Sequence, residues 1–361
     1  MMTSFKLSSI RAMAAALAVL ALVFAPLSQA EAQAKKEFKV AWSIYVGWMP
    51  WGYAADNGIV KKWADKYGIE IEMVQFNDYI ESINQYTAGA FDGVMSTNMD
   101  ALAIPSAGGV DSTIVVICDY SNGNDVIILK DKTELADIKG QNVNLVELSV
   151  SHYTLARALE TVGMTEKDVT VVNTSDADMI AAYKTRDITA VVTWNPMAAE
   201  ILGGPNANNV FDSSSIPGEI QDSLVINTAT LKANPALGKA LTGAWYETMA
   251  IMSADTPEGA AAREAMGVAS GTDLAGYEAQ LAATAMFYTP ADYIGFGEAE
   301  LAAATEKVTA FLFEHGLLGD EATSPGYIGI EMPDGSVVGD ADNVLLRFTT
   351  EYAQMLEAGM L

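Results

Sequence analysis

Cysteine and histidine are scarce in this chain. Cys118 is the single cysteine, so no intramolecular disulfide can form. The two histidines, His152 and His315, lie far apart in the sequence. Because thiol and imidazole groups are so few, we expect no metal site rich in either ligand, and we predict neither a bound metal nor a cofactor.

Basic residues are also few. Lysine and arginine together number 20 against 46 aspartates and glutamates, which gives a formal net charge of −26. Such an excess of negative charge argues against a nucleic-acid partner and against binding to anionic membranes. It favours neutral or cationic ligands, although a solvated acidic surface also accounts for it.

The N-terminal segment has the features of an export signal. Two basic residues precede an apolar run at about residues 13–24, and Pro26 and small residues follow it. We predict that residues 1–34 are a secretory signal peptide, because the run is too short for a stable membrane span. The mature protein is then expected in the periplasm. No cysteine follows the run, so we expect no lipid anchor.

Strand and helix patterns alternate along most of the chain, which predicts an α/β fold. Apolar runs mark the strands of a first lobe, at residues 38–41, 70–76, 91–96 and 113–118. The alternation restarts for a second lobe, with strands at 142–147, 169–172 and 190–193. We predict two lobes joined by two hinge crossings, with residues 35–122 and 225–361 in lobe 1 and residues 123–224 in lobe 2.

The C-terminal part is rich in alanine and predicts a helical extension of the first lobe. Helices are expected at residues 52–67 in the first lobe and, in the extension, at 235–252, 257–266, 274–284, 298–315 and 343–357. Pro333-Asp334-Gly335 predicts the turn of a hairpin within residues 327–338. No repeat of fixed period is present, and we expect a monomer.

An aromatic loop follows the first predicted strand. It contains Trp42, Tyr45 and Trp48, and Trp194 follows a strand of the second lobe. Open α/β sheets bind ligands at the carboxyl ends of their parallel strands. Ring faces attract cations and stack on planar groups. The loop at residues 42–51 also contains Trp51, and we predict that at least two of its four rings face a ligand. Trp194 is a further candidate, and the alternative for each ring is packing between a strand and a helix.

Polar side chains at other strand ends complete the predicted site. Glu147 could accept two hydrogen bonds from a guanidinium or urea group, or else cap a helix or join the lobes by a salt bridge. Asp119 has a similar position, with a turn or hinge role as the alternative. Uncharged hydrogen bonds to the ligand, or helix capping instead, are expected from Ser96, Thr97, Asn98, Ser149, Ser151, His152 and Asn195.

The order of several motifs resembles the nitrate/sulfonate/taurine-type (NitT/TauT-like) periplasmic binding proteins of ABC importers. Residues 47–50, Gly-Trp-Met-Pro, and the helix motif at 54–58 are similar to the start of these proteins. Residues 86–94 and 135–140 resemble their later strand and second-lobe motifs. The resemblance implies a type II-like two-lobed fold, a small-molecule ligand in the cleft and membrane permease subunits as partners.

The predicted ligand loops depart from the pattern expected for an anionic ligand. Relatives for nitrate or sulfonate are expected to present basic groups or helix N-termini to the anion. The loops at residues 42–51, 96–100, 147–153 and 193–195 contain no lysine or arginine. We therefore predict a small planar nitrogenous solute, such as a urea-, guanidine-, amine- or amide-like compound. A small anion (nitrate, a sulfonate or taurine) is the second candidate.

No catalytic arrangement is evident in the sequence, and we predict no catalytic residue. It contains neither a G-x-S-x-G nor an H-E-x-x-H motif. Pyrimidine-synthase-like enzymes share the implied fold, but they are intracellular and carry a cysteine-rich stretch. The export signal and the lone Cys118 argue against that class. A structural or adhesive role is disfavoured by the absence of repeats.

Overall fold

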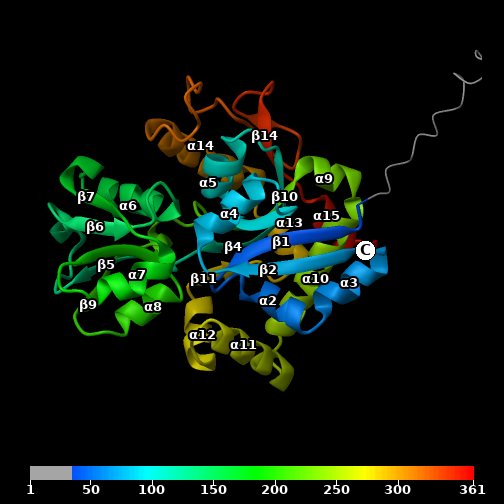
Figure 1. Cartoon of the computed structure of the whole chain (residues 1–361), viewed down its shortest axis with the longest axis horizontal. Helices are drawn as coiled ribbons and strands as arrows, with labels where there is room; N and C mark the ends of the chain where they lie inside the picture. The colour runs from blue at the N-terminus through cyan, green and yellow to red at the C-terminus, as the bar shows by residue number, and fades with distance from the viewer. Residues whose placement is uncertain (1–34) are drawn as a thin grey trace, which may run out of the picture. The chain divides into compact units, whose positions relative to one another are not determined.

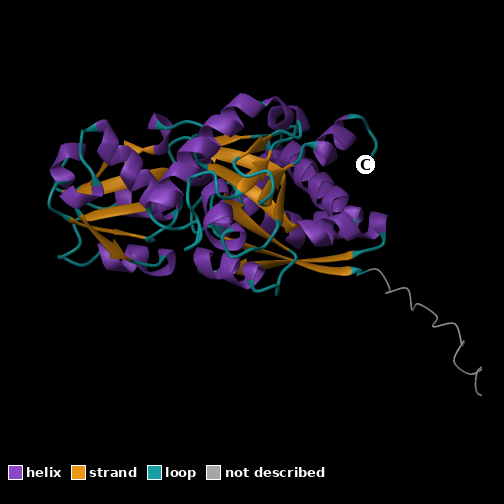
Figure 2. Ribbon diagram, turned by 90° about the horizontal axis from the view of Figure 1, so that it is seen from above, coloured by secondary structure: helices purple, strands orange, loops and turns teal. Residues whose placement is uncertain are grey.

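The computed structural model describes residues 35–361, apart from the side chains of residues 298 and 299. The predicted signal peptide at residues 1–34 lies outside this range. Residues 36–361 form one compact unit built on two β-sheets, with helices packed around each sheet (Figures 1 and 2). Within the described range, no helix has both the length and the apolar character needed to cross a membrane.

The larger sheet has nine strands, in the order β13-β12-β14-β4-β10-β3-β1-β2, with β11 paired to β4. Strands β1, β2 and β3 are parallel, and β10 runs antiparallel between β3 and β4. The carboxyl ends of β1, β3 and β4 therefore meet the amino end of β10 at one edge. The strands are β1 Glu37–Ser43, β2 Glu70–Phe76, β3 Gly93–Thr97, β4 Ser112–Ser121, β10 Gln221–Asn227, β11 Thr284–Met286, β12 Gly329–Glu331, β13 Val337–Val338 and β14 Val344–Phe348.

The smaller sheet has five strands, in the order β7-β6-β8-β5-β9. Strand β6 is parallel to β7 and β8, whereas β5 is antiparallel to β8 and β9. The amino end of β5 therefore lies beside the carboxyl end of β8, where Asp125 pairs with Trp194. The strands are β5 Asp125–Lys130, β6 Asn142–Leu145, β7 Thr170–Asn173, β8 Ala190–Trp194 and β9 Ala207–Asp212.

Helices α6, α7 and α8 pack against the smaller sheet, and most of the other helices pack around the larger one. Side-chain caps begin several of them; Asp78 Oδ1, for example, accepts the Glu81 N–H at 2.8 Å. The α-helices are α2 Met49–Asp56, α3 Ile59–Tyr67, α4 Tyr79–Thr87, α5 Asn98–Ala101, α6 Val150–Thr161, α7 Asp176–Tyr183, α8 Met197–Leu202, α9 Thr228–Ala233, α10 Pro235–Met252, α11 Pro257–Ala269, α12 Leu274–Leu281, α13 Pro290–Gly295, α14 Glu298–Glu314 and α15 Glu351–Glu357. Short turns of other helix types are η1 Leu102–Ser106, η2 Leu135–Ile138, η3 Glu166–Asp168 and η4 Ser213–Ser215.

The predicted α/β architecture with a largely helical C-terminal part is confirmed, and so is the hairpin of β12 and β13. The chain passes from one sheet to the other between β4 and β5 and returns between β9 and β10. The exact lobe boundaries at residues 122 and 225 stay a prediction.

Three predicted helices differ from the structure. The helix expected at 52–67 is two helices, α2 and α3, because Gly58 between them has a left-handed φ of 73°. The helix expected at 343–357 begins as β14, whose residues pair with β4. The helix expected at 274–284 ends at Leu281, and β11 then pairs with the far end of β4. In the last two cases, pairing with a distant strand overrides the local helical pattern.

Candidate ligand-binding site

The edges of the two sheets enclose a small cavity at the strand ends described above. Its lining comes from both sheets: Tyr45, Trp48, Tyr79, Thr97, Asp125, Val150, Trp194, Ile220 and Asp222. The cavity volume is about 20 Å³. One ordered water needs roughly 10–15 Å³, so the cavity as it stands holds about one water, and a larger solute needs its walls to move apart.

Four aromatic rings form a continuous series of contacts across this cavity. Tyr45 and Trp48 meet edge to face with centroids 5.3 Å apart, and Trp48 and Tyr79 are 5.5 Å apart. Tyr79 then meets Trp194 of the smaller sheet at 5.8 Å. These four side chains are 2–6% exposed, so the cavity is largely shielded from bulk water.

Buried carboxyl groups accompany the rings. Asp125 and Asp222 line the cavity, and Asp119 lies behind it as the cross-strand partner of Asp222. Tyr45 donates its hydroxyl to Asp119 Oδ1 at 3.0 Å, and Tyr79 donates to Asp100 Oδ2 at 2.8 Å. In the part of the chain that the structure describes, no lysine or arginine lines the cavity.

Burial without a cationic partner changes the acidity of these groups. It raises the pKa of Asp119 to about 7 and the pKa of Asp125 and Asp100 to about 6. Burial and the neighbouring Asp119 raise the pKa of Asp222 well above its usual range. Asp119 and Asp222 are cross-strand partners, so a negative charge on one raises the cost of ionising the other, and within residues 35–361 Asp119 Oδ2 has no hydrogen-bond partner. A cation or an N–H-rich solute in the cavity would offset the cost of these desolvated carboxyls.

One buried donor at the cavity is unpaired. Within residues 35–361, Trp48 Nε1 has no hydrogen-bond partner, although its side chain is 3% exposed. Buried N–H groups normally have an acceptor, so a group without one marks a place where a ligand oxygen would be favourable.

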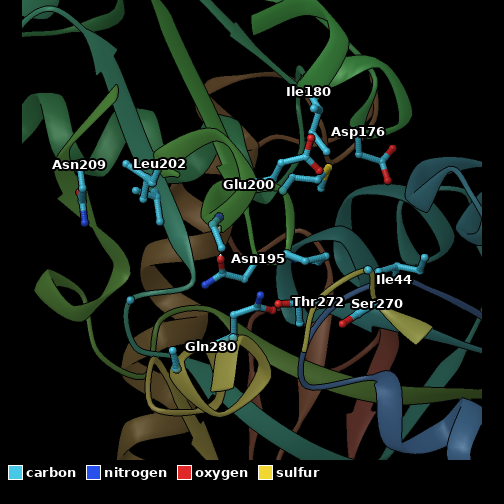
Figure 3. A pocket seen from close by; sticks show the side chains of 18 of the residues that line it. Ile44, Asp176, Ile180, Asn195, Glu200, Leu202, Asn209, Ser270, Thr272 and Gln280 are labelled. Atoms are coloured by element: carbon cyan, nitrogen blue, oxygen red, sulfur yellow. Dashed lines mark hydrogen bonds between the residues drawn. The ribbon is translucent and has the colours of Figure 1, made fainter. Parts of the chain in front are cut away.

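A larger groove of about 820 Å³ lies beside the cavity (Figure 3). Asp176 and Glu200 of the smaller-sheet region lie on one side, and Ser270, Thr272 and Gln280 lie on the other. Three chain segments line both spaces, because Ile44, Val126 and Asn195 line the groove while their sequence neighbours Tyr45, Asp125 and Trp194 line the cavity. The groove and the cavity therefore share walls from both sheets.

The structure brings four of the predicted site residues to the cavity, and these are Tyr45, Trp48, Thr97 and Trp194. Asp119 stands one layer behind them and positions Tyr45 through their hydrogen bond. Thr97 also accepts the Asp100 N–H and so begins α5, the role predicted for Asn98.

Four other predicted residues lie elsewhere. Trp42 packs beside Gly52 in a separate pocket. Ser96 is fully buried and donates to the Thr97 carbonyl. Asn98 donates to the Glu219 carbonyl and accepts the Gln221 N–H, each at 3.1 Å, which fixes the chain entering β10. Asn195 donates to Asn124 Oδ1 at 2.8 Å and lines the groove rather than the cavity.

The candidates around residue 150 are a correction to the predicted site. Strand β6 ends at Leu145, so Glu147 lies in the following turn, exposed and outside the cavity. Ser149 caps α6 by accepting the Ser151 N–H, and Ser151 is buried within that helix. His152 faces Glu166 instead of the cavity. The geometry therefore gives no support to ligand contact through Glu147 or His152.

Sequence reasoning missed five cavity residues: the aliphatic Val150 and Ile220, and the polar or aromatic Tyr79, Asp125 and Asp222. Asp125 and Asp222 are at or next to the amino ends of β5 and β10, which run antiparallel to their neighbours. A search restricted to the carboxyl ends of strands passes over such positions. Tyr79 is the first residue of α4, directly after its cap Asp78.

The chain matches a protein-family model and is similar in fold to solved binding proteins. The model of the NMT1-like family matches residues 41–269. The alkanesulfonate-binding protein SsuA from Xanthomonas axonopodis pv. citri, bound to MOPS, has a TM-score of 0.66 at 17% identity, covering 80% of this chain and 96% of that one. The periplasmic aliphatic sulphonate-binding protein SsuA from Escherichia coli has a TM-score of 0.64 at 17% identity, covering 80% and 95%.

A nitrate-binding protein has a similar fold. The periplasmic NrtA from Synechocystis PCC 6803 has a TM-score of 0.51 at 15% identity and covers 65% of each chain. No curated protein sequence matches the chain significantly. Together these findings confirm the predicted resemblance to nitrate/sulfonate/taurine-type solute-binding proteins and the predicted two-lobed fold.

Proposed function

The chain belongs to the NMT1-like family, and from this premise we propose that it is the extracytoplasmic binding component of an ABC importer. Its ligand is a small planar nitrogen compound of the guanidine or urea type, held in the cavity between the two sheets. One observation about the lining of this cavity supports the proposal. Four aromatic rings and two buried aspartates line one small cavity to which no described lysine or arginine contributes.

Charge supports a cationic or N–H-rich ligand. Asp125 and Asp222 line the cavity, and Asp119 stands directly behind Asp222. An anion at this place would stand against buried carboxyl groups whose raised pKa already reflects the cost of placing negative charge there. Hydrogen bonds between a guanidinium and a carboxylate are shorter and stronger than neutral ones.

The rings support a flat ligand. Trp48 and Trp194 come from opposite sheets, and Tyr79 contacts both. Ring faces of this kind stabilise a cation by about 0.5–2 kcal/mol each, depending on how far it is desolvated. The unpaired Trp48 Nε1–H adds a donor that the oxygen of a urea or amide could accept.

The second candidate is a small anion, because similar folds are named for sulfonate and nitrate binding. It needs donors, but the hydroxyls of Tyr45, Tyr79 and Thr97 already donate to Asp119 and Asp100, which leaves the Trp48 indole as the unpaired donor among the described lining residues. The acidic lining favours the nitrogen compound over the anion. Within the described residues, no serine, cysteine, histidine or lysine lines the cavity, which favours binding over catalysis.

Calorimetric titration and thermal melts of the full chain test the proposal. Guanidinium chloride, urea, acetamide and methylammonium at low millimolar concentration are compared with nitrate, taurine and sodium chloride at equal ionic strength. We expect guanidinium or urea to bind and to raise Tm. Binding of nitrate or taurine, with no response to the nitrogen compounds, would overturn the assignment.

Matched variants locate the binding. Asp125→Asn should weaken guanidinium binding by about 10- to 150-fold, as expected for a lost charged hydrogen bond of about 1.5–3 kcal/mol. Glu147→Gln removes the same charge from an exposed turn outside the cavity and should leave affinity unchanged. Equal effects of the two substitutions would mean that only the overall charge matters and that the cavity is not the site.

A further inference from the structure

A second cluster of polar side chains lies outside the cavity, and it contains both histidines of the sequence. His152 comes from α6, Glu166 from η3, and His315 from the end of α14. Each offers one ligand atom, and these atoms all lie within 4.8 Å of one another. The two imidazole rings have centroids 5.1 Å apart. The fold thus brings together two histidines that are few and far apart in the sequence, which had argued against a metal site.

Each histidine contacts a different carboxylate oxygen of Glu166. His315 Nε2 lies 2.8 Å from Glu166 Oε2, and His152 Nε2 contacts Glu166 Oε1. His152 is nearly fully buried, with its side chain 5% exposed, whereas Glu166 and His315 are 31% and 17% exposed. A carboxylate held between two imidazoles is a donor set that suits zinc and similar divalent ions.

The hydrogen bond made by His315 Nδ1 determines the tautomer of this ring, and so which nitrogen carries the lone pair. His315 Nδ1 lies 2.8 Å from the Phe311 carbonyl oxygen, so it carries a proton and donates it. The Nε2 lone pair then faces a carboxylate oxygen, and this contact is favourable only with a cation between the two atoms. That cation is either a proton or a metal ion. A backbone carbonyl that orients the far nitrogen is also the usual outer support of a metal-bound histidine.

His152 is arranged differently. The Leu148 N–H donates to His152 Nδ1 at 3.1 Å, which places the ring proton on Nε2 in the metal-free state. Metal binding at Nε2 moves that proton to Nδ1 and releases the Leu148 N–H, which can turn to water because Leu148 is 40% exposed. Ligand atoms around zinc stand roughly 3.3 Å apart when each bond is about 2.0–2.1 Å. The two contacts with Glu166 must therefore lengthen, and any pair of ligand atoms near the 4.8 Å limit must approach, which are small movements of side chains.

We propose that His152, Glu166 and His315 bind one divalent transition-metal ion, best suited to Zn²⁺, with water as the fourth ligand. A groove of about 290 Å³ reaches the cluster and is lined by Glu166 and His315 among others, so water and the ion have access. The ion joins α6 and η3, which belong with the smaller sheet, to α14 in the C-terminal extension. It therefore fastens these two regions together at a place separate from the ligand cavity.

Zn²⁺ titration of the chelator-treated full chain tests this site. We expect binding of one Zn²⁺ per chain, a higher Tm with Zn²⁺, and little response to Mg²⁺ or Ca²⁺, which prefer oxygen ligands. Co²⁺ in place of Zn²⁺ should give a visible absorption band of a four-coordinate site. His315→Gln and Glu166→Gln should each weaken Zn²⁺ binding by at least about 10-fold.

The matched control is Glu314→Gln, which neutralises an exposed carboxylate beside His315 in the same groove. It should bind Zn²⁺ like the unmodified chain. Far-ultraviolet circular dichroism and Tm in chelator identify any variant that fails to fold, and the Co²⁺ spectrum of the unmodified chain needs no variant. The proposal is wrong if the unmodified chain binds no Zn²⁺, or binds it as well after His315→Gln. The cluster would then hold protons alone.

Discussion

At the scale of single residues, Asp119 and Asp222 carry the unusual chemistry of this protein. They face each other from β4 and β10, both fully or nearly fully buried. The raised pKa of Asp119 means that the folded chain binds a proton there more tightly than the unfolded chain, whose aspartates titrate near 3.9. Stability contributed by that proton is present at low pH and is lost as pH rises through about 7.

Asp119→Asn removes this titration while keeping an oxygen that can accept the Tyr45 hydroxyl. We expect the variant, without ligand, to melt at a higher temperature than the unmodified chain at pH 8, with the difference shrinking toward pH 4. Each kcal/mol corresponds to roughly 2–4 °C in a protein of this size. Calorimetric melts across this pH range measure it, and a difference that is constant with pH would contradict the raised pKa of Asp119.

Trp48 allows the ring and the N–H to be separated. Trp48→Phe keeps an aromatic face but removes the unpaired Nε1–H, whereas Trp48→Ala removes both. We expect Trp48→Ala to weaken guanidinium binding by about 2- to 30-fold, the loss of one cation–π contact. Trp48→Phe should spare guanidinium but weaken urea, which loses a donor to its oxygen. If Trp48→Ala binds both solutes normally, the ring is not in the site.

At the scale of elements, the loop between β1 and α2 brings a ring and a carboxyl group together. A Cβ built on Gly47 would lie 2.7 Å from the Tyr45 ring and 3.0 Å from Asp119 Cγ. Tyr45 lines the candidate cavity and Asp119 accepts its hydroxyl, so position 47 has room only for glycine.

Gly47→Ala should therefore displace Tyr45 or Asp119, lower Tm and weaken guanidinium binding. Gly203→Ala is the control, because its Cβ would meet backbone oxygens at 3.4 and 3.5 Å, which is ordinary contact. Calorimetry and titration report the two effects separately. Normal binding by Gly47→Ala would show that the loop yields without moving the site.

The same elements show how far sequence reasoning reaches. Tyr45, Trp48 and Trp194 follow strands in loops, and the rule that ligands bind at carboxyl strand ends predicted all three positions at the cavity. It missed Asp125 and Asp222 because strand direction depends on pairing with distant strands. The same reasoning selected Glu147 as a strand-end residue, whereas β6 ends two residues before it, at Leu145. It also predicted a helix over β14, whose conformation is fixed by pairing with β4.

At the scale of the whole molecule, Glu219 links three distant segments. Its carboxylate accepts Arg157 Nε at 2.8 Å and the Tyr153 hydroxyl at 2.6 Å from α6, and it pairs with Lys307 of α14. Burial alone would raise the pKa of Glu219, but the bonds from Arg157, Lys307 and Tyr153 outweigh it and lower the pKa. The stability gained is present above the unfolded pKa and is lost as pH falls through the lower folded value.

Glu219→Gln should reduce the free energy of unfolding at pH 7 by roughly 1–3 kcal/mol, the cost of leaving charged partners without their acceptor. The difference from the unmodified chain should shrink below about pH 4, where the unfolded carboxyl is protonated. Glu160→Gln removes only an exposed partner of Arg157 and should change little. A loss at pH 7 that persists unchanged at pH 3 would contradict the ionic account.

The ring of Tyr79 contacts both Trp48 and Trp194, and all three rings are almost wholly buried. A solute held among them would touch residues associated with both sheets, so its contacts would break in the same step in which the rings separate. Solutes that stabilise the closed arrangement more strongly should therefore leave more slowly.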